Sequence, residues 1–560
     1  MQQNGPADLA FVSGVVYTVD DRRPRAEAVA IRDGRIVGVG GDDEIRDHVG
    51  SATEVHDLAG RMLLPGFQDA HVHPPSAGVG MITCALQEAH ARQDYLRIIK
   101  AYADAHPDLE WITGDGWAMD VFPGGTPTAT DLDSVVPDRP ALLYNRDGHG
   151  AWANTRALEV GGITAQTPDP PDGRIERGAD GAATGTLHEG AVDLIARHVP
   201  PVDAATLHEG LRIAQAHLHS LGITAWQDAI VGYESVYDTQ ETYLTMARSG
   251  ELTARVVAAL WWDRHRGEEQ IPDLIASREA GSAGRYRATT IKIMQDGVCE
   301  NFTGALLTPY LNASGGESDN RGISFVEPEA LKRHVTRLDR EGFQVHFHAI
   351  GDRAVREALD AFETARAANG ANDHRHHISH IQVVHPDDIP RFAALDVVAN
   401  GQPLWAAYEP QMTTLTIPFL GSERASWQYP FGSLLRSGAR LAFGSDWSVS
   451  SPDPLEEIHV AVNRMQPPDY PYGSDDPLEN EPFFPDERIS LDEALRAFTL
   501  GSAFVNHLDT ETGSIEVGKL ADLTVLDRDL FEAGDRHIAE ASVQLTLVEG
   551  ERVFEAPGFA

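Results

Sequence analysis

The feature that most constrains the fold of this chain is a repeated alternation of short apolar runs with longer amphipathic runs through its middle. The apolar, strand-like runs lie at residues 291–294, 344–348, 396–399 and 440–443, and helical patterns lie at 353–368 and 386–395. This alternation predicts a parallel sheet covered by helices. If the sheet closes into a barrel, we expect chemically active side chains at the carboxyl ends of its strands.

The two ends of the chain have a different texture, with short β-rich runs broken by turn residues. These runs lie at residues 9–19, 28–31, 35–39, 54–62, 521–527 and 543–554. A length of 560 residues exceeds one ordinary compact core, so more than one packed unit is expected. We predict that residues 1–66 and 506–560 pair into one small β-sandwich beside a main domain at 67–505.

Residues from about 74 to 200 interrupt the alternation. This stretch contains a Pro-Gly-Gly-Thr-Pro-Thr run at 123–128 and a very polar run at 168–184. Such breaks are typical of loops and irregular segments. We predict an insertion that caps the barrel mouth rather than a separate folding domain.

Composition excludes several classes of function. A formal net charge of -40 repels nucleic acid and anionic membranes, and no run approaches the ~18 apolar residues of a membrane span. The two cysteines, Cys84 and Cys299, are too few for a disulfide framework or a cysteine metal site. A cytoplasmic protein that acts on a small molecule is expected. The oligomeric state does not follow from the sequence, and a homodimer is one compatible assembly.

Two sequence contexts suggest metal ligands. His71 and His73 follow a buried-looking run, and residues two apart on a strand face the same side. Lys292 interrupts an apolar strand, where an amine is costly unless it is paired, neutral or modified. The chain has only 4 Lys among its 45 basic residues, which favours a lysine-specific role such as a carbamate ligand over a salt-bridged lysine.

Three further candidates lie at the ends of later strands. His348 is nearer its strand end than His346, so we interpret His348 as the ligand and His346 as a supporting or core residue. His380 also lies where a strand ends, whereas His374, His376 and His377 are interpreted as solvated or substrate-facing. Asp446 follows an apolar run and a glycine, a position from which it can contact a metal and a water. The full candidate set is His71, His73, Lys292, His348, His380 and Asp446.

The order and context of these six residues resemble the amidohydrolase superfamily. In that family the first strand supplies His-x-His, the fourth a lysine that is often carboxylated, the fifth and sixth one histidine each, and the eighth an aspartate. The likeness extends along nearly the whole chain, to the Gly-Ser-Ile-Glu-Val-Gly-Lys-Leu-Ala-Asp run that begins at Gly513. It implies a (β/α)₈ TIM barrel, with the β-sandwich and the insertion added.

Within the superfamily the sequence is most similar to the N-substituted formamide deformylase branch. The similarity rests on Gly-Asp-Gly-Trp at 114–117, Asp-Gly-His-Gly-Ala-Trp-Ala-Asn at 147–154 and Gly-Thr-Leu-His-Glu at 185–189. Gly-Ile-Thr at 222–224 and Lys292 with Asp296 and Gly297 add to it. One departure is Gln-Pro-Leu-Trp at 402–405, where the seventh strand would be expected to end in a histidine-rich run.

The resemblance implies a metal-activated hydroxide that cleaves a non-peptide carbon–nitrogen bond. One zinc ion would bind His71, His73 and Asp446, and the Lys292 carbamate would bridge to a second ion on His348 and His380. Manganese, iron or nickel would also bind such a set, and an unmodified lysine would leave a single-metal site. Asp446 is the expected catalytic proton shuttle.

We predict that the aromatic residues Trp117, Phe122, Trp152 and Trp405 line a substrate pocket, which would favour an apolar group on the amide nitrogen. Two alternatives remain open at this stage. The same site could hydrolyse or deaminate a cyclic or other small amide. A metal-free relative could act as a scaffold, although a scaffold would have no need of Lys292 or Asp446.

Overall fold

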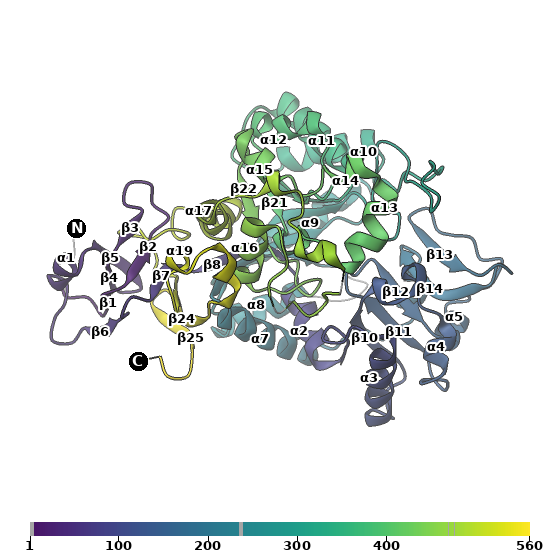
Figure 1. The fold of residues 1–560 in the computed structure, drawn as a ribbon, viewed down its shortest axis with the longest axis horizontal. Helices are drawn as coiled ribbons and strands as arrows, with labels where there is room; N and C mark the ends of the chain where they lie inside the picture. The colour runs from purple at the N-terminus through teal and green to yellow at the C-terminus, as the bar shows by residue number, and fades with distance from the viewer. Residues whose placement is uncertain (1–4, 234–238, 469, 475, 560) are drawn as a thin grey trace.

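A parallel barrel forms the centre of the molecule (Figure 1). The computed structural model describes residues 5–233, 239–468, 470–474 and 476–559. Within these residues the barrel strands are, in spatial order, β8 (Phe67–Val72), β15 (Ile223–Val231), β16 (Arg255–Trp261), β18 (Tyr286–Met294), β19 (Gln344–Ala349), β20 (His377–His380), β21 (Val398–Gly401) and β22 (Leu441–Phe443). Each pairs in parallel with the next.

Helices cover the outside of the barrel, as the alternation predicted. They include α7 (Ala204–Ser220), α8 (Thr239–Ser249), α10 (Pro328–Arg340), α11 (Asp352–Asn369) and α12 (Ile389–Leu395). The predicted strand at 396–399 begins two residues late, because Asp396 ends α12 in the left-handed conformation with φ 57°. The predicted (β/α)₈ barrel is otherwise confirmed.

The first and last barrel strands are joined by hydrogen bonds at their carboxyl ends. The amide of Asp446 donates to the carbonyl of His71 (2.8 Å), and the amide of His73 donates to the carbonyl of Trp447 (3.0 Å). The buried carboxylate of Asp69 accepts from the Ser445 hydroxyl at 2.6 Å. Burial raises the pKa of Asp69 to about 7. Closure of the barrel therefore holds the His-x-His strand beside Asp446.

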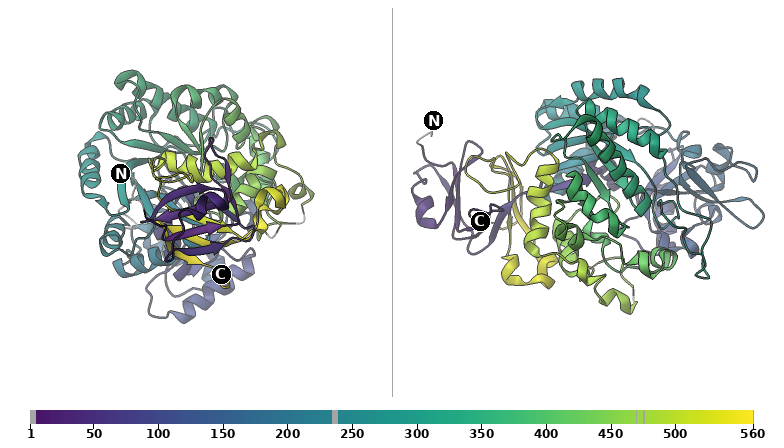
Figure 2. Two further views of the ribbon diagram at one scale, coloured as in Figure 1. Left: turned by 90° about the vertical axis from the view of Figure 1, so that its left-hand side faces the viewer. Right: turned by 90° about the horizontal axis from the view of Figure 1, so that it is seen from above.

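Both chain ends contribute to a β-sandwich at one end of the barrel (Figure 2). One sheet contains β5 (Arg35–Gly40), β4 (Ala28–Arg32), β1 (Leu9–Val12) and β6 (Glu54–Asp57). The other contains β25 (Glu551–Glu555), β24 (Val543–Val548), β23 (Leu523–Leu526), β7 (Met62–Pro65), β2 (Val15–Tyr17) and β3 (Arg25–Ala26). The C-terminal strands thus share a sheet with N-terminal strands instead of forming a half-sandwich of their own.

Two of the predicted β runs are each divided between the sheets. The run at 9–19 breaks at Ser13 (φ 57°), and the run at 54–62 breaks at Ala59 (φ 51°) and Gly60 (φ 83°). These left-handed residues turn the chain from one sheet into the other. A shared apolar core, which includes Phe11 and Leu63, joins the two sheets.

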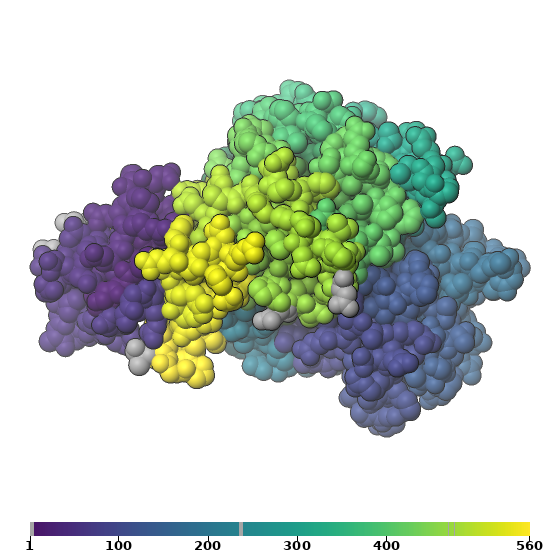
Figure 3. Space-filling view, viewed as in Figure 1, coloured from purple at the N-terminus to yellow at the C-terminus, as the bar shows by residue number. Residues whose placement is uncertain are grey.

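The insertion lies at the opposite end of the barrel from the sandwich (Figure 3). Its sheet contains β13 (Gly173–Arg177), β14 (Ala183–Glu189), β12 (Gly150–Ala153), β11 (Ala141–Asn145), β10 (Ile112–Trp117) and β9 (Cys84–Ala85), and helix α3 (Arg92–Ala105) packs against it. The insertion contains two apolar clusters, one of which also includes Leu415 from outside it. Among the described residues, no helix is both long and apolar enough to cross a membrane.

Candidate metal centre

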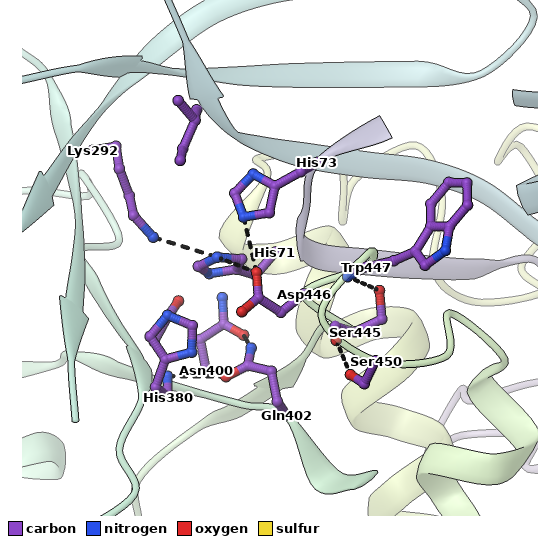
Figure 4. Close-up of polar contacts among 12 residues, drawn as sticks. His71, His73, Lys292, His380, Asn400, Gln402, Ser445, Asp446, Trp447 and Ser450 are labelled. Atoms are coloured by element: carbon purple, nitrogen blue, oxygen red, sulfur yellow. Dashed lines mark hydrogen bonds and ion pairs between the residues drawn. The ribbon is translucent and has the colours of Figure 1, made fainter. Parts of the chain in front are cut away.

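His71, His73 and Asp446 meet at the carboxyl end of the barrel (Figure 4). Asp446 Oδ1 lies 2.8 Å from His73 Nε2 and 3.2 Å from His71 Nε2, and one ligand atom from each residue lies within 4.8 Å of the others. Burial opposes ionisation of Asp446, but the two imidazoles outweigh it and hold the pKa of its carboxyl well below the usual value. This is a compact set of N and O donors of the kind that zinc binds.

Lys292 reaches the same point from β18. Its side chain is buried, and Nζ lies 3.4 Å from His71 Nε2. Burial lowers the pKa of Lys292 to about 7, with the charge of Asp446 opposing the shift. Burial, followed by the charge of Lys292, lowers the pKa of His71 to about 3. The amine therefore lies beside a neutral imidazole, in an environment that favours its own neutral form.

His348 and His380 complete the group on the next two strands. Their rings lie 4.4 Å apart, and the His380 ring lies 4.7 Å from that of His71, centroid to centroid. Both ring nitrogens of His380 are buried and have no hydrogen-bond partner within the described part of the chain. Buried imidazoles are normally satisfied, so these nitrogens fit a metal-ligand role. Burial lowers the pKa of both His348 and His380 well below the usual value.

Of the other histidines singled out in the sequence, His346 supports a ligand from outside and His376 does not. His346 Nε2 lies 2.9 Å from His71 Nδ1 and 2.6 Å from the Ser379 hydroxyl, so it holds the His71 ring in place. His377 is fully buried with its ring 4.0 Å from that of His346, and His376 contacts Asp339 of α10 at 3.0 Å. The prediction that His377 is solvated or substrate-facing is wrong, because its side chain is fully buried. His376 is half-buried and stacks on Phe362 of α11.

The departure at 402–405 has a structural explanation. Gln402 Oε1 accepts a hydrogen bond from the backbone amide of His380 at 3.0 Å. His380 has a φ of 76°, which is rare for a non-glycine residue. Trp405 stacks on the His380 ring at 5.4 Å with an interplanar angle of 11°, and its Nε1 donates to Ser450 Oγ at 3.1 Å. The end of the seventh strand thus positions His380 and places an aromatic face beside it.

The structure corrects the prediction for the other three aromatic residues. Trp117, Phe122 and Trp152 pack against one another in the core of the insertion. The indole of Trp117 donates to the carbonyl of Leu143 at 2.8 Å, and that of Trp152 donates to the carbonyl of Thr128 at 2.7 Å. Large rings with satisfied N–H groups are typical of a core. Only Trp405 of the four lies at the metal centre.

Sequence reasoning missed three polar residues that face the site. Asp296 accepts backbone N–H bonds from Ala305, Ile350 and Gly351, and its Oδ1 lies 3.3 Å from His348 Nδ1. From the insertion, His149 Nδ1 lies 2.9 Å from Glu189 Oε1.

The electrostatics of the insertion pair follow from that contact. Burial alone would lower the pKa of His149, but the Glu189 carboxylate raises it to about 9. Burial opposes ionisation of Glu189, but His149 lowers the pKa of that carboxyl to about 2. Both residues and Asp296 belong to the sequence runs shared with the deformylase branch. Their position in these shared runs was the sequence feature that could have indicated a role at the site.

A parallel eight-stranded barrel with histidine, aspartate and lysine side chains at its carboxyl end is an architecture on which metal-dependent hydrolases are built. The sequence agrees with this class. Residues 54–554 match the model of the amidohydrolase family, and the chain belongs to that family. The resemblance inferred from the sequence is therefore confirmed, and the protein is a hydrolytic enzyme.

Three relatives cover nearly the whole chain. The protein LONG AFTER FAR-RED 3 of Arabidopsis thaliana is 31% identical over 98% of this chain and 92% of its own. The N-substituted formamide deformylase of Arthrobacter pascens is 28% identical over 98% and 99%. An uncharacterized metal-dependent hydrolase from Pyrococcus furiosus has a similar solved structure, with a TM-score of 0.68, 26% identity and coverage of 93% and 99%.

Proposed function

We propose that this enzyme cleaves a non-peptide amide bond in a small molecule, with zinc as its metal and N-substituted formamides as its substrate class. The observation that carries the proposal is the group of His71, His73 and Asp446 beside the buried amine of Lys292. Full-length similarity to an N-substituted formamide deformylase supports the substrate class. Two free, buried cysteines support a cytoplasmic location.

The donor set fits two ions. His71, His73 and Asp446 would hold one, and His348 and His380 would hold the other. Lys292 would connect them as a carbamate, which forms only from a neutral amine; its lowered pKa supports this. A divalent cation in such a site supplies a nucleophilic hydroxide at neutral pH, because it lowers the pKa of water from ~15.7 towards ~7.

The protein's own residues then guide the hydrolysis. Asp446 accepts the proton of the water as its oxygen bonds to the acyl carbon, and delivers that proton to the nitrogen as the carbon–nitrogen bond breaks. The products are a carboxylic acid, formate for a formamide, and an amine. The face of Trp405 beside His380 offers an apolar surface to the group on the nitrogen.

A substrate panel tests the proposal. We expect prolonged chelation to abolish hydrolysis and added zinc or manganese to restore it. N-benzylformamide should release formate with a kcat/KM at least roughly tenfold above that of formamide, because a buried phenyl ring contributes about 2 kcal/mol. Trp405→Ala should raise KM for the benzyl substrate and leave formamide unaffected.

Two outcomes would contradict the proposal at different levels. Equal rates on both formamides, or turnover of a cyclic amide with no formate from either, would remove the deformylase assignment. Full activity in a verified metal-free preparation would remove the metal mechanism as well.

A further inference from the structure

The insertion brings one side chain to the metal centre that the mechanism above does not use. His149 lies between β11 and β12, and its ring centroid lies 5.1 Å from that of His348. Its Nδ1 lies 2.9 Å from the carboxylate of Glu189, the last residue of β14. A histidine–carboxylate pair therefore reaches from the insertion to the carboxyl end of the barrel.

Residues that follow barrel strand β18 bind the carboxylate of Glu189. Glu189 Oε1 accepts from Thr303 Oγ1 at 2.8 Å and from Asn301 Nδ2 at 3.2 Å, both in the segment after β18. A β-carbon at Gly297 would lie 1.9 Å from Thr303 Oγ1 and 2.3 Å from the same Glu189 oxygen, so a larger residue there would displace this pair of side chains. Glu189 itself has a φ of 51°, a costly conformation for a non-glycine residue that is retained where a side chain must be placed.

Three contacts fix the position of His149, and its Nε2 is left without a hydrogen-bond partner among the described residues. Its amide donates to Asp147 Oδ1 at 2.9 Å, its carbonyl accepts from Asn301 Nδ2 at 3.3 Å, and Nδ1 contacts Glu189. Its Nε2 makes no hydrogen bond to any residue in the described ranges, and 11% of the side chain remains exposed. A pair that only tied the insertion to the barrel would have no need to leave this nitrogen open beside the site.

We propose that His149 is the substrate-contacting residue contributed by the insertion, with its Nε2 hydrogen-bonded to the reacting amide. This role rests on the proposed function, because the amide is the group that both would recognise. Glu189 acts through His149 and is a positioning residue. Asn301, which binds both, also lines a cavity of about 310 Å³ with the charged or polar side chains of Arg174, Glu176, His188 and Glu300.

Side-chain replacements separate a contact from a structural role. His149→Asn keeps an amide near the position of Nδ1 and removes Nε2. We expect it to lower kcat/KM for N-benzylformamide, measured per folded and metal-loaded molecule, by on the order of 10²-fold, the scale of a lost hydrogen bond to a reacting group. Tm should also fall, because the buried carboxylate of Glu189 loses its cationic partner. His149→Gln, whose amide reaches the position of Nε2, should recover part of the loss.

Glu189→Gln should cost about tenfold, because it loosens the ring without removing it. The double variant with His149→Asn should be no worse than His149→Asn alone, since Glu189 acts only through His149. The matched control is His376→Asn. His376 also pairs with a carboxylate at 3.0 Å and is 12% exposed, but it directly precedes β20 and stacks on Phe362 of α11, so this variant should keep normal kcat/KM.

Normal kcat/KM in His149→Asn, a loss that disappears when kcat/KM is calculated per folded and metal-loaded molecule, or additive effects in the double variant would overturn the proposal. Binding of an N-benzyl phosphonamidate to the zinc-loaded protein, measured by calorimetry, requires no turnover. If the wild-type enzyme cleaves no formamide, the proposed substrate class fails. Weaker phosphonamidate binding by His149→Asn would then still support the contact, and equal binding would overturn it.

Discussion

The two ends of the barrel differ in how their buried charged groups and imidazoles are paired. At the amino end, Arg255 begins β16 and contacts Asp522 at 2.8 Å and Glu549 at 2.6 Å, both in the sandwich. At the carboxyl end, both ring nitrogens of His380 lack a hydrogen-bond partner in the described chain, and the one hydrogen-bond contact of the Lys292 amine among the described residues is with the His71 imidazole. Burial of an unpaired polar group is costly, so the unpaired groups at the carboxyl end of the barrel indicate that this end is the catalytic one.

If this contrast is correct, substitutions at the carboxyl end should affect catalysis, and substitutions at the amino end should affect stability. The largest effect on turnover is expected from Lys292→Arg. Arginine stays protonated and cannot form a carbamate, so this variant should lose bound metal and turnover together. Metal analysis and kcat measured on the same preparation test this.

Lys292→Ala provides the control for this effect. A short carboxylic acid with added metal should partly restore its turnover, because the acid can replace the missing carbamate oxygens. An arginine variant with normal turnover would show that Lys292 serves only as a charge or a packing residue.

A smaller loss is expected from Asp446→Asn. The amide keeps the shape of the side chain and some bound metal, but it cannot accept a proton. We expect kcat to fall by on the order of 10²-fold or more, the scale of a removed general base. Steady-state kinetics with metal content measured in parallel would show this; an unchanged kcat with a raised KM would instead assign Asp446 to binding.

At the amino end, Arg255→Met should leave kcat per folded molecule unchanged. This variant leaves the buried carboxylate of Asp522 without its cationic partner, so the free energy of unfolding should fall by roughly 3 kcal/mol. Adding Asp522→Asn should recover part of the loss, because it removes the uncompensated charge. Chemical denaturation monitors the stability, and a fall in kcat with unchanged stability would contradict the contrast between the two ends.

Much of the fold could be predicted because it depends on local patterns. Apolar runs of strand length that alternate with helices led to the parallel sheet with its helices, and the family resemblance led to its closure into a barrel. The turn from β4 to β5 is equally local, with φ of 49° at Asp33 and 73° at Gly34. The insertion was harder to interpret. Its strands pair between distant and irregular segments, as with β12 and β14, and no local period marks such pairing.

The site could be predicted in part for a similar reason. His71, His73, Lys292 and Asp446 come together because parallel strands present their carboxyl ends at one edge. The aromatic prediction failed because residue type alone does not distinguish a pocket wall from a core. Trp152 fills the core of the insertion, whereas Trp405, with the same side chain, lies against His380.

The sequence by itself determined the barrel, the order of the candidate ligands and the family. Each of these features can be recognised from short stretches of consecutive residues. The tertiary structure alone decided what surrounds the ligands. It placed His346 behind His71, Gln402 behind His380, and the His149–Glu189 pair above His348. These contacts join residues from 22 to 275 positions apart, and only the closed, packed chain fixes the distances between them.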